Sequence, residues 1–282
     1  MKLLVYISIL FFASGLHAQD YPVRFGELMA DGDTVAQREL LNEWWQHDST
    51  DAEYYVACFN FYIQKSMHDI AYISESELRD FNYSKRYTDS AFMIVRKGLA
   101  LHPDRLDMRF GEIYMYGETV NFEMYTKRLL ETVAYSVENN NNWLWTNGEV
   151  LENPRELFLK SIQDYQMTIF NSDNDSLRDY ALQIADGVLK YYPDHVPSLS
   201  NAAVVHIYRK EYDKALEYLL KANALSPEDH VIIMNLAWLY RILGDYENSI
   251  LYYEMSLEYG DEKANEVAVQ AINEMREATN KE

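Results

Sequence analysis

Cysteine is almost absent from this chain, since Cys58 is the only one in 282 residues. A single thiol cannot form an intramolecular disulfide, so the fold must be stabilised by packing alone. Glycine and proline are also scarce, with 10 and 6 residues. A turn-rich β-fold needs more of both, whereas long helices do not. The sequence therefore predicts an all-α protein.

Basic residues are in short supply as well. The chain has 25 lysines and arginines against 45 aspartates and glutamates, which gives a formal net charge of −20 at pH 7. A strongly negative protein is repelled by nucleic acid and by anionic membrane surfaces. We therefore expect neither of them as a partner.

Long hydrophobic runs are missing except at the beginning of the chain. There, Lys2 precedes an apolar run from Leu3 to Ser14, which is too short to span a bilayer. Small residues follow it and end at Ala18, so we expect a signal peptide over residues 1–18 that is cleaved before Gln19. The alternative is a buried N-terminal helix. No cysteine stands at the cleavage site, so we expect a periplasmic or secreted protein without a lipid anchor and without membrane insertion.

Motifs for catalysis and metal binding are absent too. The seven histidines are scattered, and no H-E-x-x-H motif or pair of cysteines accompanies them. There is no glycine-rich phosphate loop and no nucleophile elbow. His206 falls in an apolar helical pattern, where a packed core histidine is the expected role. We therefore expect no catalytic residue, no metal and no cofactor.

The sequence does contain an internal repeat. The segment "KEYDKAL" at residues 210–216 is followed 34 residues later by "GDYENSI" at residues 244–250. Both segments sit between two apolar helical patterns, which predicts two helix-turn-helix units at residues 196–229 and 230–263. The matching positions hold a tyrosine, a small residue and an aliphatic residue: Tyr212 and Tyr246, Ala215 and Ser249, Leu216 and Ile250.

These units resemble the tetratricopeptide repeat, a 34-residue helix-turn-helix motif with small residues where its two helices touch and a proline near its end. Pro227 closes the first unit, 12 residues after Ala215, and the same spacing separates Ala181 from Pro193 and Ala91 from Pro103. The resemblance implies a right-handed α-solenoid over residues 19–282. Its clearest repeats are 196–229 and 230–263, and degenerate repeats cover 33–139 and 154–195.

A stripe of apolar residues at helical spacing follows the last repeat. Such a stripe can cover the apolar face that the final helix pair of a repeat array leaves exposed. We therefore predict a C-terminal capping helix over residues 264–278. The stripe consists of Ala264, Val267, Ala268, Ala271, Ile272 and Met275.

The resemblance also implies where a ligand would bind, because the first helices of tetratricopeptide repeats line a concave groove that holds a partner peptide. It implies a non-enzymatic interaction module or scaffold of an exported bacterial type, which binds a protein or peptide partner outside the cytoplasm. Arg241 would supply a rare positive charge for an acidic group on that partner. The groove residues would be Tyr55, Phe59, Tyr62, Tyr208, Met234, Trp238 and Arg241.

Asn201 and Asn235 occupy positions that some family members use to clamp a C-terminal carboxylate. The lysines that complete such a clamp are absent from this sequence.

The segment "NNNNWLWTNGEV" at residues 139–150 is the second candidate site. Four consecutive asparagines disfavour a continuing helix, because their side chains compete for backbone hydrogen bonds. If the segment is extended, Trp143 and Trp145 project to the same side. They could form a plug over an exposed repeat face, which we favour because exposed tryptophans are unfavourable in water. Alternatively, with the groove aromatics, they could stack on a sugar ring in a carbohydrate-capture protein.

Overall fold

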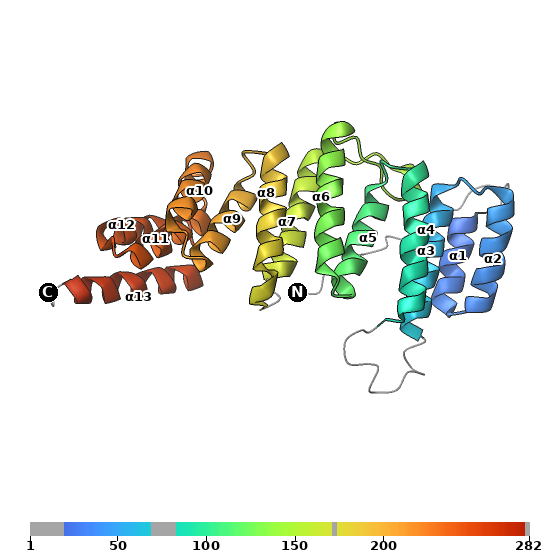
Figure 1. Ribbon diagram of the computed structural model, residues 1–282, viewed down its shortest axis with the longest axis horizontal. Coiled ribbons are helices and arrows are strands. Elements are labelled where there is room, and N and C mark those ends of the chain that lie inside the picture. Colours follow the sequence, from blue (N-terminus) through green and yellow to red (C-terminus); the bar gives the residue numbers. More distant parts are fainter. Residues whose placement is uncertain (1–19, 69–82, 171–173, 280–282) are drawn as a thin grey trace. The chain divides into compact units, whose positions relative to one another are not determined.

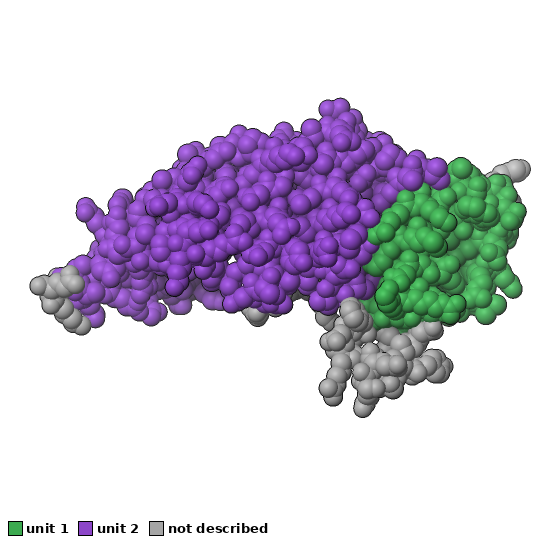
Figure 2. Space-filling view, viewed as in Figure 1, with its two compact units in different colours: residues 1–73, 83–98 green, residues 74–82, 99–282 purple. Residues whose placement is uncertain are grey.

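The computed structural model describes residues 20–68, 83–170 and 174–279. Within these ranges the chain forms thirteen α-helices, two short 3-10 helices and no β-strand. The chain divides into two compact units, coloured separately in Figure 2: unit 1 holds residues 1–73 and 83–98, and unit 2 holds 74–82 and 99–282. The expected signal peptide lies outside the described residues.

Unit 1 is built from the first helices of the chain. Its core is aromatic: the rings of Tyr21 and Trp44 stack with their centroids 5.2 Å apart. Gly32 ends the first helix in a left-handed conformation at φ 71°, and Asp33 caps the second helix immediately afterwards. The helices are α1 (Tyr21–Asp31), α2 (Thr34–His47), α3 (Ala52–His68) and most of α4 (Lys85–Leu101).

Unit 2 contains successive helix pairs that follow one another in chain order (Figure 1). The pairs are α5 (Leu106–Glu118) with α6 (Phe122–Glu138), α7 (Pro154–Phe170) with α8 (Arg178–Tyr191), α9 (Val196–Tyr208) with α10 (Tyr212–Leu225), and α11 (His230–Leu243) with α12 (Tyr246–Ser256). The 3-10 helices η2 (Thr146–Gly148) and η3 (Asp175–Leu177) lie before α7 and α8, and α13 (Glu262–Thr279) ends the array.

The predicted small residues lie where helices touch. Ala215 in α10 and Ser249 in α12 are fully buried, as are Ala91 in α4 and Ala181 in α8. A small side chain lets two helix backbones approach closely, and the next pair then covers the remaining apolar surface. The predicted all-α fold of helix-turn-helix repeats is therefore confirmed.

The two repeated segments, residues 210–216 and 244–250, begin with the same kind of turn. Gly244 ends α11 at φ 77°, and Lys210, its counterpart one repeat earlier, has φ 60°. Both residues lie in the left-handed region, which glycine adopts readily and lysine does not. The turn between helices is thus conserved between the repeats even though only one of them has the favoured residue.

The C-terminal helix α13 covers the end of the array, as predicted. Its buried residues form one cluster with Ala237 of α11 and Tyr253 of α12. Val267 is an exception, because its side chain is 51% exposed although it belonged to the predicted stripe. The contact surface of α13 is therefore narrower than the sequence suggested, and it is formed by Ala268, Ala271, Ile272 and Met275.

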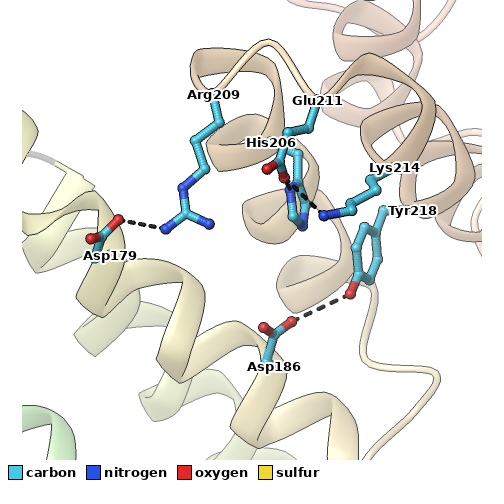
Figure 3. A network of polar contacts seen from close by, with 7 residues as sticks. All are labelled: Asp179, Asp186, His206, Arg209, Glu211, Lys214 and Tyr218. Atoms are coloured by element: carbon cyan, nitrogen blue, oxygen red, sulfur yellow. Dashed lines mark hydrogen bonds and ion pairs between the residues drawn. The ribbon is translucent and has the colours of Figure 1, made fainter.

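Polar side chains on neighbouring helices join α8 to the next repeat (Figure 3). Arg209 Nη2, just after α9, lies 2.5 Å from Asp179 Oδ1 of α8, and the hydroxyl of Tyr218 in α10 donates to Asp186 of α8 at 3.3 Å. These contacts fix the position of the helix pair α9 and α10 against α8.

His206 is a packed core histidine, in agreement with the sequence prediction. Its Nδ1 lies 2.6 Å from a carboxylate oxygen of Glu211, and its ring stacks on Tyr218 with centroids 5.6 Å apart. Lys214 Nζ lies 3.2 Å from the same oxygen of Glu211. Hydrogen bonds from His206 and Lys214 lower the pKa of the Glu211 carboxyl. The cluster holds the turn between α9 and α10 together (Figure 3).

Candidate functional site

An exposed aromatic side chain stands out on the first helices of the C-terminal repeats. Tyr208, at the end of α9, is 51% exposed. Its ring meets Trp238 of α11 edge to face, with centroids 6.2 Å apart. The guanidinium carbon of Arg178 lies 3.8 Å from the centroid of the Tyr208 ring. Arg178, Tyr208 and Trp238 thus form a row across α8, α9 and α11, which we name the aromatic row.

The row and the predicted residue Met234 beside it differ in how far they also support the fold. Trp238 is half-buried and packs against the core between α9, α10 and α11. Met234, one turn earlier on α11, is half-buried against the cluster under α13. Tyr208 is the most exposed of these residues, at 51%. Tyr208 is therefore the residue of this face that is most available to a partner.

Arg241, whose positive charge we expected to meet an acidic group on a partner, pairs with a carboxylate of this chain. Its Nη2 lies 2.7 Å from Oε2 of Glu274, which belongs to α13. The pair is possible because α13 folds back over the last repeat and brings Glu274 beside the end of α11. Arg241 therefore joins the last repeat to its capping helix.

The three predicted residues of unit 1 belong to its interior. Tyr55 is 3% exposed, and its hydroxyl donates to the carbonyl of Ser49 at 2.9 Å. Phe59 is buried, and Tyr62 is half-buried against the aromatic core. The repeat resemblance predicted that these residues of α3 face a ligand, but in the structure they pack inside unit 1. We therefore leave them out of the candidate site.

The two asparagines at clamp positions bond to neighbouring first helices instead. Asn201 Nδ2 of α9 donates to Gln166 Oε1 of α7 at 2.7 Å. One repeat later, Asn235 Nδ2 of α11 donates to Ser200 Oγ of α9 at 3.1 Å. Together these bonds form an amide ladder along α7, α9 and α11, and each bond uses one of the two N–H donors of an asparagine amide.

The tryptophans of the 139–150 insertion have separate roles. Trp143 is 1% exposed, and its ring lies between those of Tyr135 and Phe158, at centroid distances of 5.8 and 5.5 Å. Trp145 is half-buried and meets Phe110 edge to face at 6.5 Å. A buried Trp143 cannot stack on a sugar ring. Of the two predicted roles, the plug fits Trp143, and the carbohydrate-binding alternative loses its main residue.

The insertion is held in place by the residues that precede α5. Leu144 N donates to the carbonyl of Asp104, and Leu106 N donates to the carbonyl of Leu144, both at 3.0 Å. The buried side chain of Arg105 makes two hydrogen bonds to Asp107, of 2.8 and 2.6 Å. The insertion is therefore a fixed part of unit 2.

Arg178 was not singled out in the sequence. It follows the polar segment at 171–177, and its place over Tyr208 depends on the packing of α8 against α9. The sequence around Arg178 predicts a turn followed by the start of a helix, but it does not predict a contact with Tyr208.

The described residues offer no site for a metal, since they bring together no group of three histidine, cysteine or acidic side chains. Cys58 is buried in unit 1, and burial raises the pKa of its thiol to about 12. Among the described helices, none combines the length and the apolar character that crossing a membrane would require.

Residues 231–259 match the sequence profile of the tetratricopeptide repeat. This segment covers α11 and α12, the helix pair that contains Trp238. A comparison with curated proteins gives no match.

Similar solved structures include YrrB, described as a tetratricopeptide-repeat protein with an unusual peptide-binding site, with 18% identity over 77% of this chain and 90% of that one, at a TM-score of 0.37. PilF of Pseudomonas aeruginosa is 14% identical over 78% of this chain and 90% of PilF, at a TM-score of 0.38. Acl4, an assembly chaperone of RpL4, is 12% identical over 94% of this chain and 99% of Acl4, at a TM-score of 0.43. Scores this low carry no argument about function.

The matched segment repeats the pattern of the preceding helix pair, since α9 and α10 lie 34 residues before α11 and α12 in matching positions. Small buried residues occupy matching positions in the two pairs, Ala215 and Ala222 in α10 and Ser249 and Ser256 in α12. The match at residues 231–259 therefore falls on the second of two helix pairs with the same arrangement, and this part of the chain is similar to the tetratricopeptide repeat.

Proposed function

We propose that this protein is a non-enzymatic interaction module that binds a peptide or protein partner along the first helices of its C-terminal repeats. Tetratricopeptide repeats typically serve as scaffolds for protein–protein interaction. The observation that carries the proposal is the exposed ring of Tyr208, held between Arg178 and Trp238.

The composition of the aromatic row suits recognition of a polypeptide. Tyrosine, tryptophan and arginine are the residues most enriched at the energetic centres of protein interfaces. Tyrosine offers a large apolar area and a hydroxyl that tolerates water, so its ring can stay exposed before a partner arrives. Arg178 also pairs with Asp175, which holds the guanidinium in position over the ring.

We place this activity outside the cytoplasm, in the periplasm or the surrounding medium, because residues 1–18 have the pattern of a signal peptide. The measurement is the intact mass of the protein recovered from its native cells. A chain beginning at Gln19 is the expected result, and a chain that retains Met1 would contradict the placement.

The binding site is tested by capture of partners from the native periplasmic fraction, followed by affinity measurement with the purified partner. Tyr208→Ala should weaken binding at least tenfold, because it removes the exposed ring at the centre of the row. The control is Leu220→Ala, which truncates an exposed apolar side chain on the second helix α10. If both variants bind the partner as the parent does, the partner lies on another surface.

A further inference from the structure

A hollow of about 600 Å³ lies beside the 139–153 insertion in unit 2. Three parts of the chain form its walls: the insertion, the first three turns of α7 and the residue that precedes α9. Small-molecule sites in proteins usually enclose roughly 300–1,000 Å³, so the hollow has the right size for a compact ligand. Its polar walls include Asn140, Asn141, Arg155, Lys160, Gln163 and His195.

The charges in the hollow are unusual for so acidic a chain. Arg155 and Lys160 both line it, and neither has an ion-pair partner among the described residues. Glu156 lines it too and stands four residues before Lys160, but the two do not form an ion pair. The hollow thus has two cations and one carboxylate in a protein with a net charge of −20.

An aromatic platform holds Arg155 in position. Its guanidinium carbon lies 5.5 Å from the ring centroid of Tyr192, a buried residue at the end of α8. The hydroxyl of Tyr192 lies 2.6 Å from Ser136 Oγ, which fixes the ring. Stacking on a ring positions a guanidinium without neutralising it, so Arg155 remains able to bind an anion bidentately.

The same tyrosine orients an amide. The Tyr192 hydroxyl lies 3.2 Å from Oδ1 of Asn141 and donates to it. This contact uses the carbonyl oxygen of the Asn141 side chain, so the amide nitrogen is left without a partner among the described residues. The NH₂ group is thus a fixed donor on the wall of the hollow.

His195 also lines the hollow. Its Nδ1 lies 2.8 Å from Ser198 Oγ, and that oxygen lies 3.1 Å from Gln166 Nε2 and 3.5 Å from Gln166 Oε1. These contacts hold the imidazole ring in place beside the hollow.

We propose that this hollow binds a compact anionic ligand through carboxylate or phosphate oxygens. Arg155 and Lys160 supply the positive charge, and the side-chain amides of Asn141 and Gln163 supply neutral donors. The proposal is independent of the aromatic row, because it uses none of the residues of that row.

The test is a titration of the full chain with inorganic phosphate and, separately, with succinate, at constant ionic strength. Nitrogen-15 NMR reports binding through the backbone amides of the 139–153 insertion and the side-chain amides of Asn141 and Gln163. The pocket variant is Arg155→Gln with Lys160→Gln. Its charge-matched control, Lys127→Gln with Lys263→Gln, changes two exposed lysines on α6 and α13 that do not line the hollow.

The expected result is saturable binding of at least one anion that is at least tenfold weaker in the pocket variant and unchanged in the control. The stronger of the two anions then distinguishes phosphate from carboxylate chemistry. Thermal melts establish that each variant is folded, and the single variant Lys160→Gln, at an exposed position, serves if the double variant is not. The proposal is overturned if neither anion saturates, or if the pocket and control variants lose affinity equally.

Discussion

The hydroxyl of Ser249 in α12 donates a hydrogen bond of 2.7 Å to the backbone carbonyl of Ala237 in α11. This bond crosses the contact between the two helices of one repeat. One repeat earlier, Ala215 occupies the same position and is fully buried without such a bond. The position therefore accepts a small side chain with or without a hydroxyl, and its size is the property that the fold requires.

Enlarging this position should destabilise the protein. Ala215→Leu adds three carbons where α9 and α10 touch, so we expect a loss of about 1–3 kcal/mol from the free energy of unfolding. The control is Glu217→Leu, two residues further along α10 and exposed, which should change stability by less than about 0.5 kcal/mol. Urea denaturation measures both, and equal losses would mean that Ala215 is not at a helix contact.

The turn before α10 should be improved by glycine. Lys210 has a left-handed backbone at φ 60°, a conformation that is unfavourable for a residue with a Cβ atom. Lys210→Gly should therefore stabilise the protein by about 0.5–1 kcal/mol. The reverse test is Gly244→Ala at φ 77°, where an added Cβ would meet no atom within 4 Å. That variant should lose stability through backbone strain alone, and a neutral result for both would refute the shared turn.

Truncation of the plug should be among the most damaging single changes. Trp143→Ala empties a fully buried site between Tyr135 and Phe158, and we expect a loss of about 3–5 kcal/mol. Trp143→Phe should cost less, because the indole N–H that it removes has no acceptor among the described residues. Thermal melts of the two variants give the comparison. A mild effect of the alanine variant would indicate that the insertion is not a structural plug.

His195 should make stability depend on pH. Burial lowers the pKa of its imidazole from 6.5 to about 4 in the folded protein. Between these values the unfolded chain binds a proton that the folded protein does not. Stability should therefore fall as the pH decreases from 6.5, by up to about 1.4 kcal/mol per pH unit, and this loss should level off below pH 4.

The check is a series of denaturant titrations from pH 7 to 4 on the parent and on His195→Gln. The glutamine variant removes the titrating group, so its stability should depend less on pH over this range. Parallel curves for the two proteins would show that His195 does not titrate with a lowered pKa.

The repeat architecture could be predicted because its signals are local and periodic. The 34-residue spacing, the small residues and the apolar stripe of α13 all recur at fixed intervals in the sequence. Their positions are also those that packing requires. The predicted burial of His206 and of Ala215 followed from the same periodicity.

The site was harder to predict, because its contacts join residues far apart in the chain. Arg241 was expected to meet an acidic group on a partner, but Glu274 of α13, 33 residues later in the chain, pairs with it. Arg178 lies over Tyr208 only after α8 and α9 pack together. Tyr55 and Trp143 had the right type for a binding surface, yet the core of each unit buries them. Helical spacing indicates on which face of a helix a residue lies, but it does not indicate which other part of the chain covers that face.

The amide ladder has a consequence for the affinity with which a partner could bind. Gln166 with Asn201, and Ser200 with Asn235, connect three successive first helices by side-chain hydrogen bonds. A change in the spacing of these helices would break a bond, so the surface that carries Tyr208 is ordered before binding. An ordered surface loses little conformational entropy on association. The ordering cost then falls on the partner, and a short extended peptide would lose more affinity from its own flexibility than from any rearrangement of this protein.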